Sequence, residues 1–139
     1  MQTITPYLLY KDVDAALDFL AKVFGFEEVL RYTGDEDYVS HAEMRIGDGT
    51  VYLGDPGDQY QSPNDLGQGT VGIAVVVDDV DGHFERAKAA GAEITEEPSD
   101  QQYGERRYIA KDLEGHSWFF SQPTREVAPE EWGATVAAD

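Results

Sequence analysis

Two stretches of the chain carry apolar residues at helical spacing, so that each stretch has one apolar face. The first follows Asp12, which is a plausible N-cap, and ends at Gly25. The second follows Asp79 and ends at Gly91. The residues of the two apolar faces are Val13, Ala16, Leu17, Leu20, Phe24, Val80, Phe84 and Ala87. This spacing predicts two amphipathic helices.

Strands are predicted on both sides of each helix. They cover residues 3–10, 26–31, 38–46 and 51–54 around the first helix, and 70–77, 92–97, 108–110 and 117–121 around the second. Pro6 has no N–H to donate to a strand ladder, so the first strand is expected at an edge or beside a seam. In residues 38–46 the side chains alternate, with Ala42 and Met44 on one face and His41 and Glu43 on the other.

The two halves of the chain match at a nearly constant offset. Gly25 and Gly91 are 66 positions apart. The same offset separates Gly49, which follows Asp48, from Gly115, and both glycines are expected to close hairpin turns. The two capping aspartates are 67 positions apart, which is a slip of one residue. Landmarks that recur in the same order indicate an internal repeat.

The pattern as a whole predicts an α+β fold made of two β-α-β-β-β units. The first unit is expected at residues 1–55 and the second at 70–121, with a linker loop at 56–69 and a C-terminal tail at 122–139. The linker is rich in Gly, Pro, Asp and Gln and is long for a compact domain, so we expect it to be either mobile or functional. The tail is expected to be partly disordered unless its anchor, Trp132, docks.

The composition excludes several classes of function. The formal charge of −18 argues against nucleic acid as a partner, because phosphate contacts need Lys and Arg. The acidity suits solubility in a salty or hot habitat, or the steering of cationic ligands. The chain has no cysteine, so disulfides and thiolate chemistry are excluded. The absence of cysteine also makes a cytoplasmic protein the expectation, and neither a membrane span nor a signal peptide is expected, because the sequence has no long apolar run and no signal-peptide pattern.

The most specific motif lies in the second half. It consists of Tyr103-Gly104-Glu105-Arg106-Arg107-Tyr108 and then Lys111-Asp112-Leu113-Glu114-Gly115-His116. This motif resembles the aromatic-Gly-x-Arg…Arg-Asp-Pro-x-Gly stretch of the vicinal oxygen chelate superfamily, with Leu113 in place of the usual proline. The superfamily includes glyoxalase I, extradiol dioxygenases and the fosfomycin and bleomycin resistance proteins, and the resemblance covers roughly residues 3–121. It implies that each unit curls its sheet into a half-open cup, with the helices on the outer face.

The resemblance also places the positions at which metal-using members carry their ligands. In such members a His or Glu stands on the first and the last strand of each unit, on the concave face. Counting from the helix caps and the turn glycines puts these positions at Thr5, Leu53, Gly72 and Phe119. No side chain of this set is a His or a carboxylate, so the resemblance implies a protein without a metal or other cofactor. It is nearest to the bleomycin-resistance members, which sequester a drug.

Aromatic residues take the place of metal ligands in the expected cup. Phe119 stands at a ligand position, and Tyr7 shares the strand face of Thr5, so both rings should face the cup. They could form a wall for a planar or cationic ligand, or they could simply fill the core. Arg107, with Arg106 before it, could clamp a ligand carboxylate or pair with nearby acidic residues. The candidate ligand-binding residues are Thr5, Tyr7, Leu53, Gly72, Ala74, Arg107 and Phe119.

The histidines can be interpreted as catalytic or as structural residues. His41 and Glu43 share a strand face, so they could form an acid–base pair or hold a displaced metal, as in a glyoxalase-like lyase, isomerase or dioxygenase. They could equally belong to an exposed polar face. We expect His116 to be a solvated turn residue and His83 to be a partly buried structural residue on the second helix.

A homodimer is the expected assembly, and a small molecule is the other expected partner. Half-open cups leave edge strands exposed, and the small-residue face of Gly72, Ala74 and Val76 suits the close approach of another surface. Two copies at −18 each repel, so the dimer should become more stable as ionic strength rises.

Overall fold

Each half of the chain folds into a four-stranded sheet with one helix, and the halves share one topology. The computed structural model describes residues 2–138. The elements are β1 (Tyr7–Leu9), α1 (Val13–Phe24), β2 (Glu27–Tyr32), β3 (His41–Ile46), β4 (Gly49–Gly54), β5 (Gly72–Val76), α3 (Val80–Ala89), β6 (Glu93–Asp100), β7 (Glu105–Lys111) and β8 (Ser117–Pro123). The strand orders are β1-β4-β3-β2 and β5-β8-β7-β6, with the first pair of each sheet parallel. The predicted α+β fold of two β-α-β-β-β units is confirmed.

Both long helices begin at an aspartate that caps the backbone. The Asp12 side chain accepts a hydrogen bond from the Ala15 N–H, and the Asp79 side chain accepts one from the Gly82 N–H. Each cap satisfies a donor that the first helical turn would leave without a partner. Gly25 ends α1 in the left-handed conformation with φ of 79°, which an L side chain rarely adopts. Local sequence therefore fixes both ends of α1 and the start of α3.

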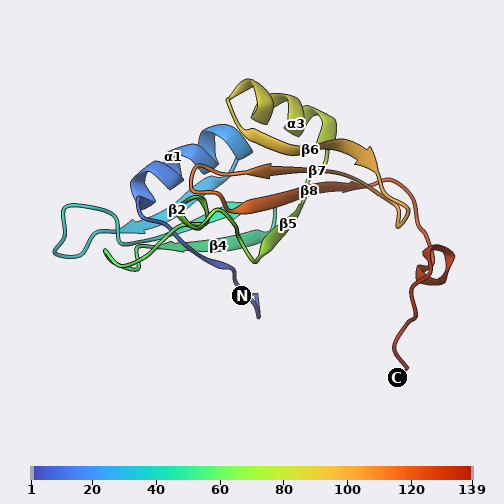
Figure 1. Cartoon of the computed structure of the whole chain (residues 1–139), viewed down its shortest axis with the longest axis horizontal. Coiled ribbons are helices and arrows are strands. Elements are labelled where there is room, and N and C mark those ends of the chain that lie inside the picture. The colour runs from blue at the N-terminus through green and yellow to red at the C-terminus, as the bar shows by residue number, and fades with distance from the viewer. Residues whose placement is uncertain (1, 139) are drawn as a thin grey trace.

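The two helices lie side by side on one face of the sheets, as Figure 1 shows, and they enclose a shared core. Trp118 and Phe120 point from β8 into this core and are fully buried, as their alternation predicts. Tyr108 of β7 is also fully buried there, so it does not face the cup. The opposite faces of both sheets carry no helix in the described residues. We call these uncovered surfaces the concave faces.

The free edges of β1 and β5 border a seam between the two sheets. β1 pairs with β4, and β5 pairs with β8. Two pockets lie along the seam, and residues near β1 and on β5 line both of them. Pro6, directly before β1, therefore stands beside a seam at a sheet edge, as expected.

The linker is not the plain loop that the sequence predicts. It contains a short helix, α2 (Pro63–Leu66), which begins with a reciprocal capping box between Ser62 and Asp65. Lys11 reaches this helix and pairs with Asp65 at 2.8 Å. The Asn64 N–H donates to the carbonyl of Glu114 in the β7–β8 turn, so α2 is tied to both halves of the chain.

The first hairpin turn lies one residue earlier than the sequence predicts. Gly47 and Asp48 form the β3–β4 turn, with Gly47 at φ of 56°, while Gly49 already belongs to β4. Counting from Gly49 therefore gave the wrong strand face. Leu53 is fully buried in the core, and its neighbour Tyr52 stands on the concave face instead.

The C-terminal tail carries an aromatic ring that docks on the body of the protein, the condition stated in the prediction. It contains a single 3-10 turn, η1 (Pro129–Trp132), and the Trp132 ring packs edge-on against Tyr103 with centroids 5.9 Å apart. The Thr124 N–H donates to the Gly104 carbonyl at 2.8 Å, which holds the start of the tail. In Figure 1 the tail extends well beyond the end of β8.

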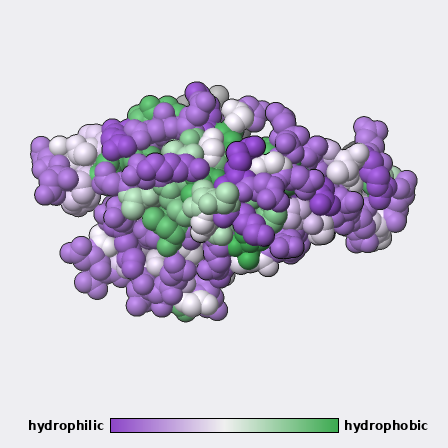
Figure 2. All heavy atoms as spheres, turned by 90° about the horizontal axis from the view of Figure 1, so that it is seen from above, coloured by the Kyte–Doolittle hydropathy of each residue, from purple (hydrophilic) through white to green (hydrophobic). Residues whose placement is uncertain are grey.

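Hydrophilic residues dominate the rim of the molecule. Figure 2 looks onto the side of the helices and shows hydrophobic residues gathering toward the middle of that face. None of the helices among the described residues is long and apolar enough to cross a membrane.

Candidate functional site

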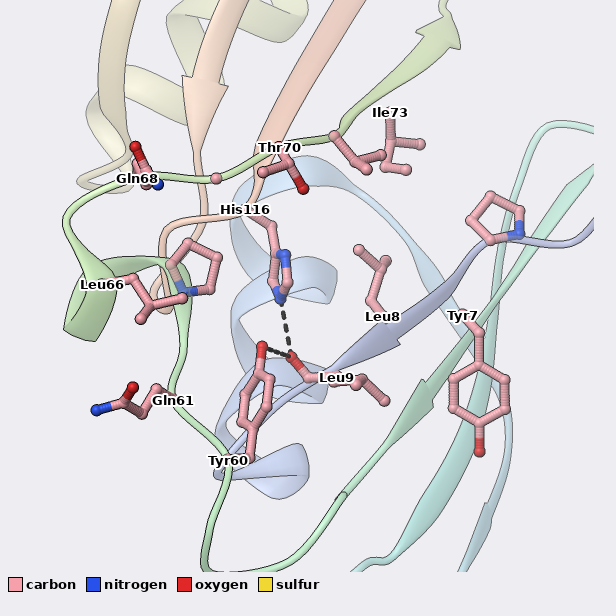
Figure 3. A pocket seen from close by; sticks show the side chains of 14 residues that line it. Tyr7, Leu8, Leu9, Tyr60, Gln61, Leu66, Gln68, Thr70, Ile73 and His116 are labelled. Carbon is pink, nitrogen blue, oxygen red and sulfur yellow. Dashed lines mark hydrogen bonds between the residues drawn. The ribbon is translucent and has the colours of Figure 1, made fainter.

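The seam pocket is the larger apolar cavity between the two halves, with a volume of about 370 Å³. β1 forms one wall, β5 with the preceding residues 68–71 forms another, and the linker with α2 closes a third side (Figure 3). This volume lies within the range of small-molecule sites. The lining residues are Pro6, Tyr7, Leu8, Leu9, Tyr60, Gln61, Pro63, Leu66, Gln68, Gly69, Thr70, Val71, Ile73 and His116.

The Leu9 carbonyl holds three segments together at the seam pocket. It accepts hydrogen bonds from His116 Nε2 at 2.8 Å and from the Tyr60 hydroxyl at 3.0 Å, as the dashed lines in Figure 3 mark. Burial raises the pKa of Tyr60, and the charge of nearby Glu114 adds to this effect. The expectation that His116 is a solvated turn residue is wrong, because its ring is half-buried and packs edge-on against Tyr10. The β7–β8 turn places it there.

Three rings meet on the concave face of the first sheet. Tyr7, His41 and Tyr52 have centroid separations of 5.6 to 5.7 Å, and the Tyr7 hydroxyl lies 2.9 Å from His41 Nδ1. Glu43 stands on the same face, since it is paired across β3–β4 with Tyr52. The cluster therefore combines electron-rich ring faces with a carboxylate, a combination that suits a planar or cationic group.

Strand glycines make room for flat rings on both concave faces. The Tyr7 ring lies across Gly54, where an added Cβ would come within 2.6 Å of it. The Phe119 ring lies across Gly72, where an added Cβ would come within 2.7 Å. The two sheets use different strands for this contact. In the first sheet a ring from β1 lies over a glycine of β4, and in the second sheet a ring from β8 lies over a glycine of β5. Any larger residue at either glycine would displace the ring.

Arg107 covers the Phe119 ring on the concave face of the second sheet. Its guanidinium lies 5.4 Å from the ring centroid and donates to Glu96 at 3.2 Å and to the Tyr103 hydroxyl at 3.0 Å. Its Nε is buried and has no hydrogen-bond partner within residues 2–138. Arg106 points to the other face and pairs with Asp81 of α3. Only Arg107 of this pair of arginines therefore borders the concave face.

At the positions where metal-using members of the superfamily carry their ligands, this chain has side chains that do not suit a divalent cation. With the corrected strand register they are Thr5, Tyr52, Gly72 and Phe119. The Thr5 hydroxyl oxygen accepts from the Gln2 amide, and the other three offer rings or no side chain. Across residues 2–138, no three His, Cys, Asp or Glu side chains come together in a group that could hold a metal ion. We therefore derive no chemistry through a metal.

The candidate residues fall into separate places along the cup. Tyr7 borders both the seam pocket and the first concave face, while Arg107 and Phe119 belong to the second. Ala74 lines a second seam pocket of about 330 Å³, near Pro6. Leu53 is the candidate that the structure removes, because its side chain lies in the core.

The linker lines the seam pocket, which is in keeping with the expectation that it is mobile or functional, but sequence reasoning did not name its lining residues. Tyr60 and Leu66 both line it, and a tyrosine and a leucine in an otherwise polar linker were the available signal. His83 has the structural role expected of it, since it is buried and its Nε2 donates to the Phe24 carbonyl.

Repeated β-α-β-β-β units with their helices on one side and an open concave side define the glyoxalase-like class of fold. The sequence profile of the Glyoxalase/Bleomycin resistance protein/Dioxygenase superfamily matches residues 3–120. The chain belongs to this superfamily.

Relatives support the assignment along almost the whole chain. Uncharacterized protein Mb0911c of Mycobacterium bovis is 36% identical, over 97% of this chain and 92% of that protein. The crystal structure of TioX from Micromonospora sp. ML1 is 35% identical with a TM-score of 0.72, and the match covers 91% of this chain and all of TioX. A glyoxalase/bleomycin resistance protein/dioxygenase from Nocardioides has a TM-score of 0.68 at 21% identity, covering 93% of this chain and 88% of that one, which shows the fold alone.

Proposed function

We propose that the protein binds a small molecule, without a metal, on the concave faces and in the seam pocket between them. The observation that carries the proposal is the pair of rings, Tyr7 and Phe119, each of which lies over a strand glycine on a concave face. Tyr7 is 53% exposed, so a planar ligand could cover much of its ring. Apolar surface that a ligand removes from water contributes about 25 cal/mol per Å² to binding.

An aromatic compound, with or without a cationic group, is the ligand class that these surfaces favour. Ring faces stack on planar ligands and attract cations. Glu43 and the net charge of −18 would add long-range attraction for a cation. An antibiotic is one such compound, in keeping with the bleomycin resistance proteins that give the superfamily part of its name.

The test is a titration of planar aromatic compounds, neutral and cationic, against the wild type and two variants. Tyr7→Ala and Phe119→Ala should each weaken binding by about ten-fold, because each removes a ring contact worth about 1.4 kcal/mol. Tyr38→Ala is the matched control, since Tyr38 is exposed in the loop before β3 and should leave affinity unchanged. Equal affinity in all four proteins would exclude binding on the concave faces.

A titration with Ni, Zn, Mn and Fe, together with elemental analysis, tests the metal-free part of the proposal. We expect no stoichiometric tight binding of any of these ions. A tightly bound metal that Tyr52→Ala or Thr5→Ala releases would contradict it.

A second function is an acid–base enzyme built on His41. The observation that favours it is the 2.9 Å contact between His41 Nδ1 and the Tyr7 hydroxyl, with Glu43 on the same face. Such an enzyme would turn over a substrate, for example a 2-oxoaldehyde adduct, and would lose that turnover in His41→Ala. If His41→Ala keeps the affinity for aromatic ligands and no substrate is turned over by the wild type, the binding function stands alone.

A further inference from the structure

We infer that the seam pocket takes an uncharged aromatic group bearing an O–H or N–H, which donates a hydrogen bond to His116 Nδ1. This inference rests on the proposed small-molecule function and names the ligand chemistry of one part of that site. It differs from the concave face of the first sheet, where ring surfaces and Glu43 suit a cationic group.

The lining of the seam pocket holds no charged residue. All fourteen lining residues are apolar, aromatic or neutral polar, apart from His116 as a titratable imidazole, although 27% of the chain is charged. A charged ligand would lose its hydration here without gaining an opposite charge, which costs several kcal/mol. Although the chain has 28 acidic residues, none of them lines the pocket, so a cation would find no direct partner there.

A hydrogen bond fixes which nitrogen of the neutral His116 ring carries the proton. The Leu9 carbonyl can only accept, so the proton of the neutral ring sits on Nε2, which donates to it at 2.8 Å. Nδ1 is then an acceptor, and no hydrogen bond within residues 2–138 uses it. Figure 3 shows the imidazole standing in the pocket, between Thr70 and Leu9 and facing Leu8.

Compared with the other polar groups that line the pocket, His116 Nδ1 is the acceptor whose position is best fixed. Tyr60 already donates its hydroxyl proton to the Leu9 carbonyl, which leaves its phenolic oxygen as an acceptor that is weaker than an imidazole nitrogen. Gln61, Gln68 and Thr70 are exposed and free to turn, whereas the His116 ring is held by the Leu9 bond and by its packing on Tyr10. A preorganised acceptor selects ligands better than a mobile one, because less freedom is lost on binding.

The experiment compares 2-naphthol with 2-methoxynaphthalene, which has a similar shape but no donor. Isothermal titration of the wild type should show 2-naphthol binding about five- to ten-fold more tightly, the usual contribution of one hydrogen bond. The nitrogen NMR signal of His116 Nδ1 should move with 2-naphthol and stay in place with the methyl ether.

Two variants separate the acceptor from the architecture of the pocket. His116→Gln places an amide where Nε2 stands, so it can still donate to Leu9, but nothing remains at Nδ1. The preference for 2-naphthol should then fall below about two-fold, while the affinity for the ether stays the same. Tyr60→Phe removes the other donor to the same carbonyl and should keep the preference.

The outcomes distinguish this inference from the function on which it rests. Equal binding of both probes to the wild type, or a preference that persists in His116→Gln, overturns the inference and leaves small-molecule binding intact. Failure of both probes to bind overturns the inference, and the Tyr7 and Phe119 variants then decide whether the concave faces bind anything.

Discussion

His83 shows how a single buried side chain can fix the protonation of its surroundings. Its Nε2 donates to the Phe24 carbonyl, so its Nδ1 accepts from the Tyr108 hydroxyl in the neutral ring. Burial lowers the pKa of His83; the hydrogen bond to the Phe24 carbonyl opposes this shift, and the charge of Arg86 adds to it. Burial also raises the pKa of Tyr108, which keeps its hydroxyl proton in place as the donor. The folded protein therefore favours the neutral imidazole.

The first prediction concerns the pH dependence that follows from His83. Because its folded-state pKa lies below the ordinary value of 6.5, the unfolded chain takes up this proton first as the pH falls. The free energy of unfolding should decrease below about pH 6.5, by up to about 1.4 kcal/mol per pH unit for one proton. Urea unfolding of the wild type and His83→Gln between pH 8 and pH 5.5 measures it. A wild-type slope no steeper than that of the variant would contradict the assignment.

At the scale of residues, the sequence predicted burial better than it predicted faces. Trp118 and Phe120 alternate clearly with their neighbours, so their burial in the core was predictable. The face of Leu53 was not predictable, because it depends on whether the hairpin turn is Gly47-Asp48 or Asp48-Gly49. A shift of one residue moves every side chain of the strand to the other face. The position of His116 depends on a carbonyl more than one hundred residues away, which no local pattern encodes.

The β7–β8 turn is the element that joins the two halves. The Asp112 carboxylate accepts from the Tyr10 hydroxyl at 2.6 Å and from Trp118 Nε1 at 3.0 Å. The Glu114 carboxylate accepts from the backbone N–H groups of Lys11 and Asp12, at the start of α1. Both carboxylates are nearly buried, so these bonds replace their lost hydration. The motif that resembles the superfamily is therefore a structural joint in this chain.

The second prediction tests this joint. Glu114→Gln replaces one accepting oxygen with an NH₂ group, which leaves one of the two backbone donors without an acceptor. We expect a loss of about 1–3 kcal/mol in the free energy of unfolding, measured by urea denaturation. Glu97→Gln, at an exposed position on β6, is the matched control and should change stability by less than about 0.5 kcal/mol. Equal effects of the two substitutions would show that the joint is not structural.

At the scale of elements, most of the fold was predictable because caps and strand patterns are local. Asp12 and Asp79 were expected as helix caps and act as such. Helix α2 was not expected, because four residues are too short to show a period. Its stability comes from Ser62, Asp65 and contacts with a distant turn.

Exposed apolar residues near the seam bear on the assembly of the whole molecule. Ile4 is 82% exposed, Val71 68% and Val76 65%, and the free edges of β1 and β5 lie close to them. In a homodimer that covers this region, these apolar residues would be buried on both copies. The unpaired backbone groups at the free strand edges would gain hydrogen-bond partners. We therefore keep the homodimer as a proposal for this protein.

The third prediction is that the dimer becomes more stable as salt rises, because salt screens the repulsion between two copies at −18 each. Light scattering at low and high salt measures the mass. Val76→Asp should shift the protein toward the monomer, whereas Val29→Asp, at an exposed position on β2, should not. A monomeric mass at both salt concentrations would refute the proposal.

The most direct measurement of the central claim is an NMR map of ligand binding on the intact protein. The account predicts that 2-naphthol shifts the backbone amide signals of Leu9, Ile73 and His116 around the seam pocket. A larger planar aromatic compound should also shift those of Gly54 and Gly72, which lie beneath the Tyr7 and Phe119 rings. Shifts confined to α1 and α3 on the opposite face, or no shifts with either compound, would contradict it.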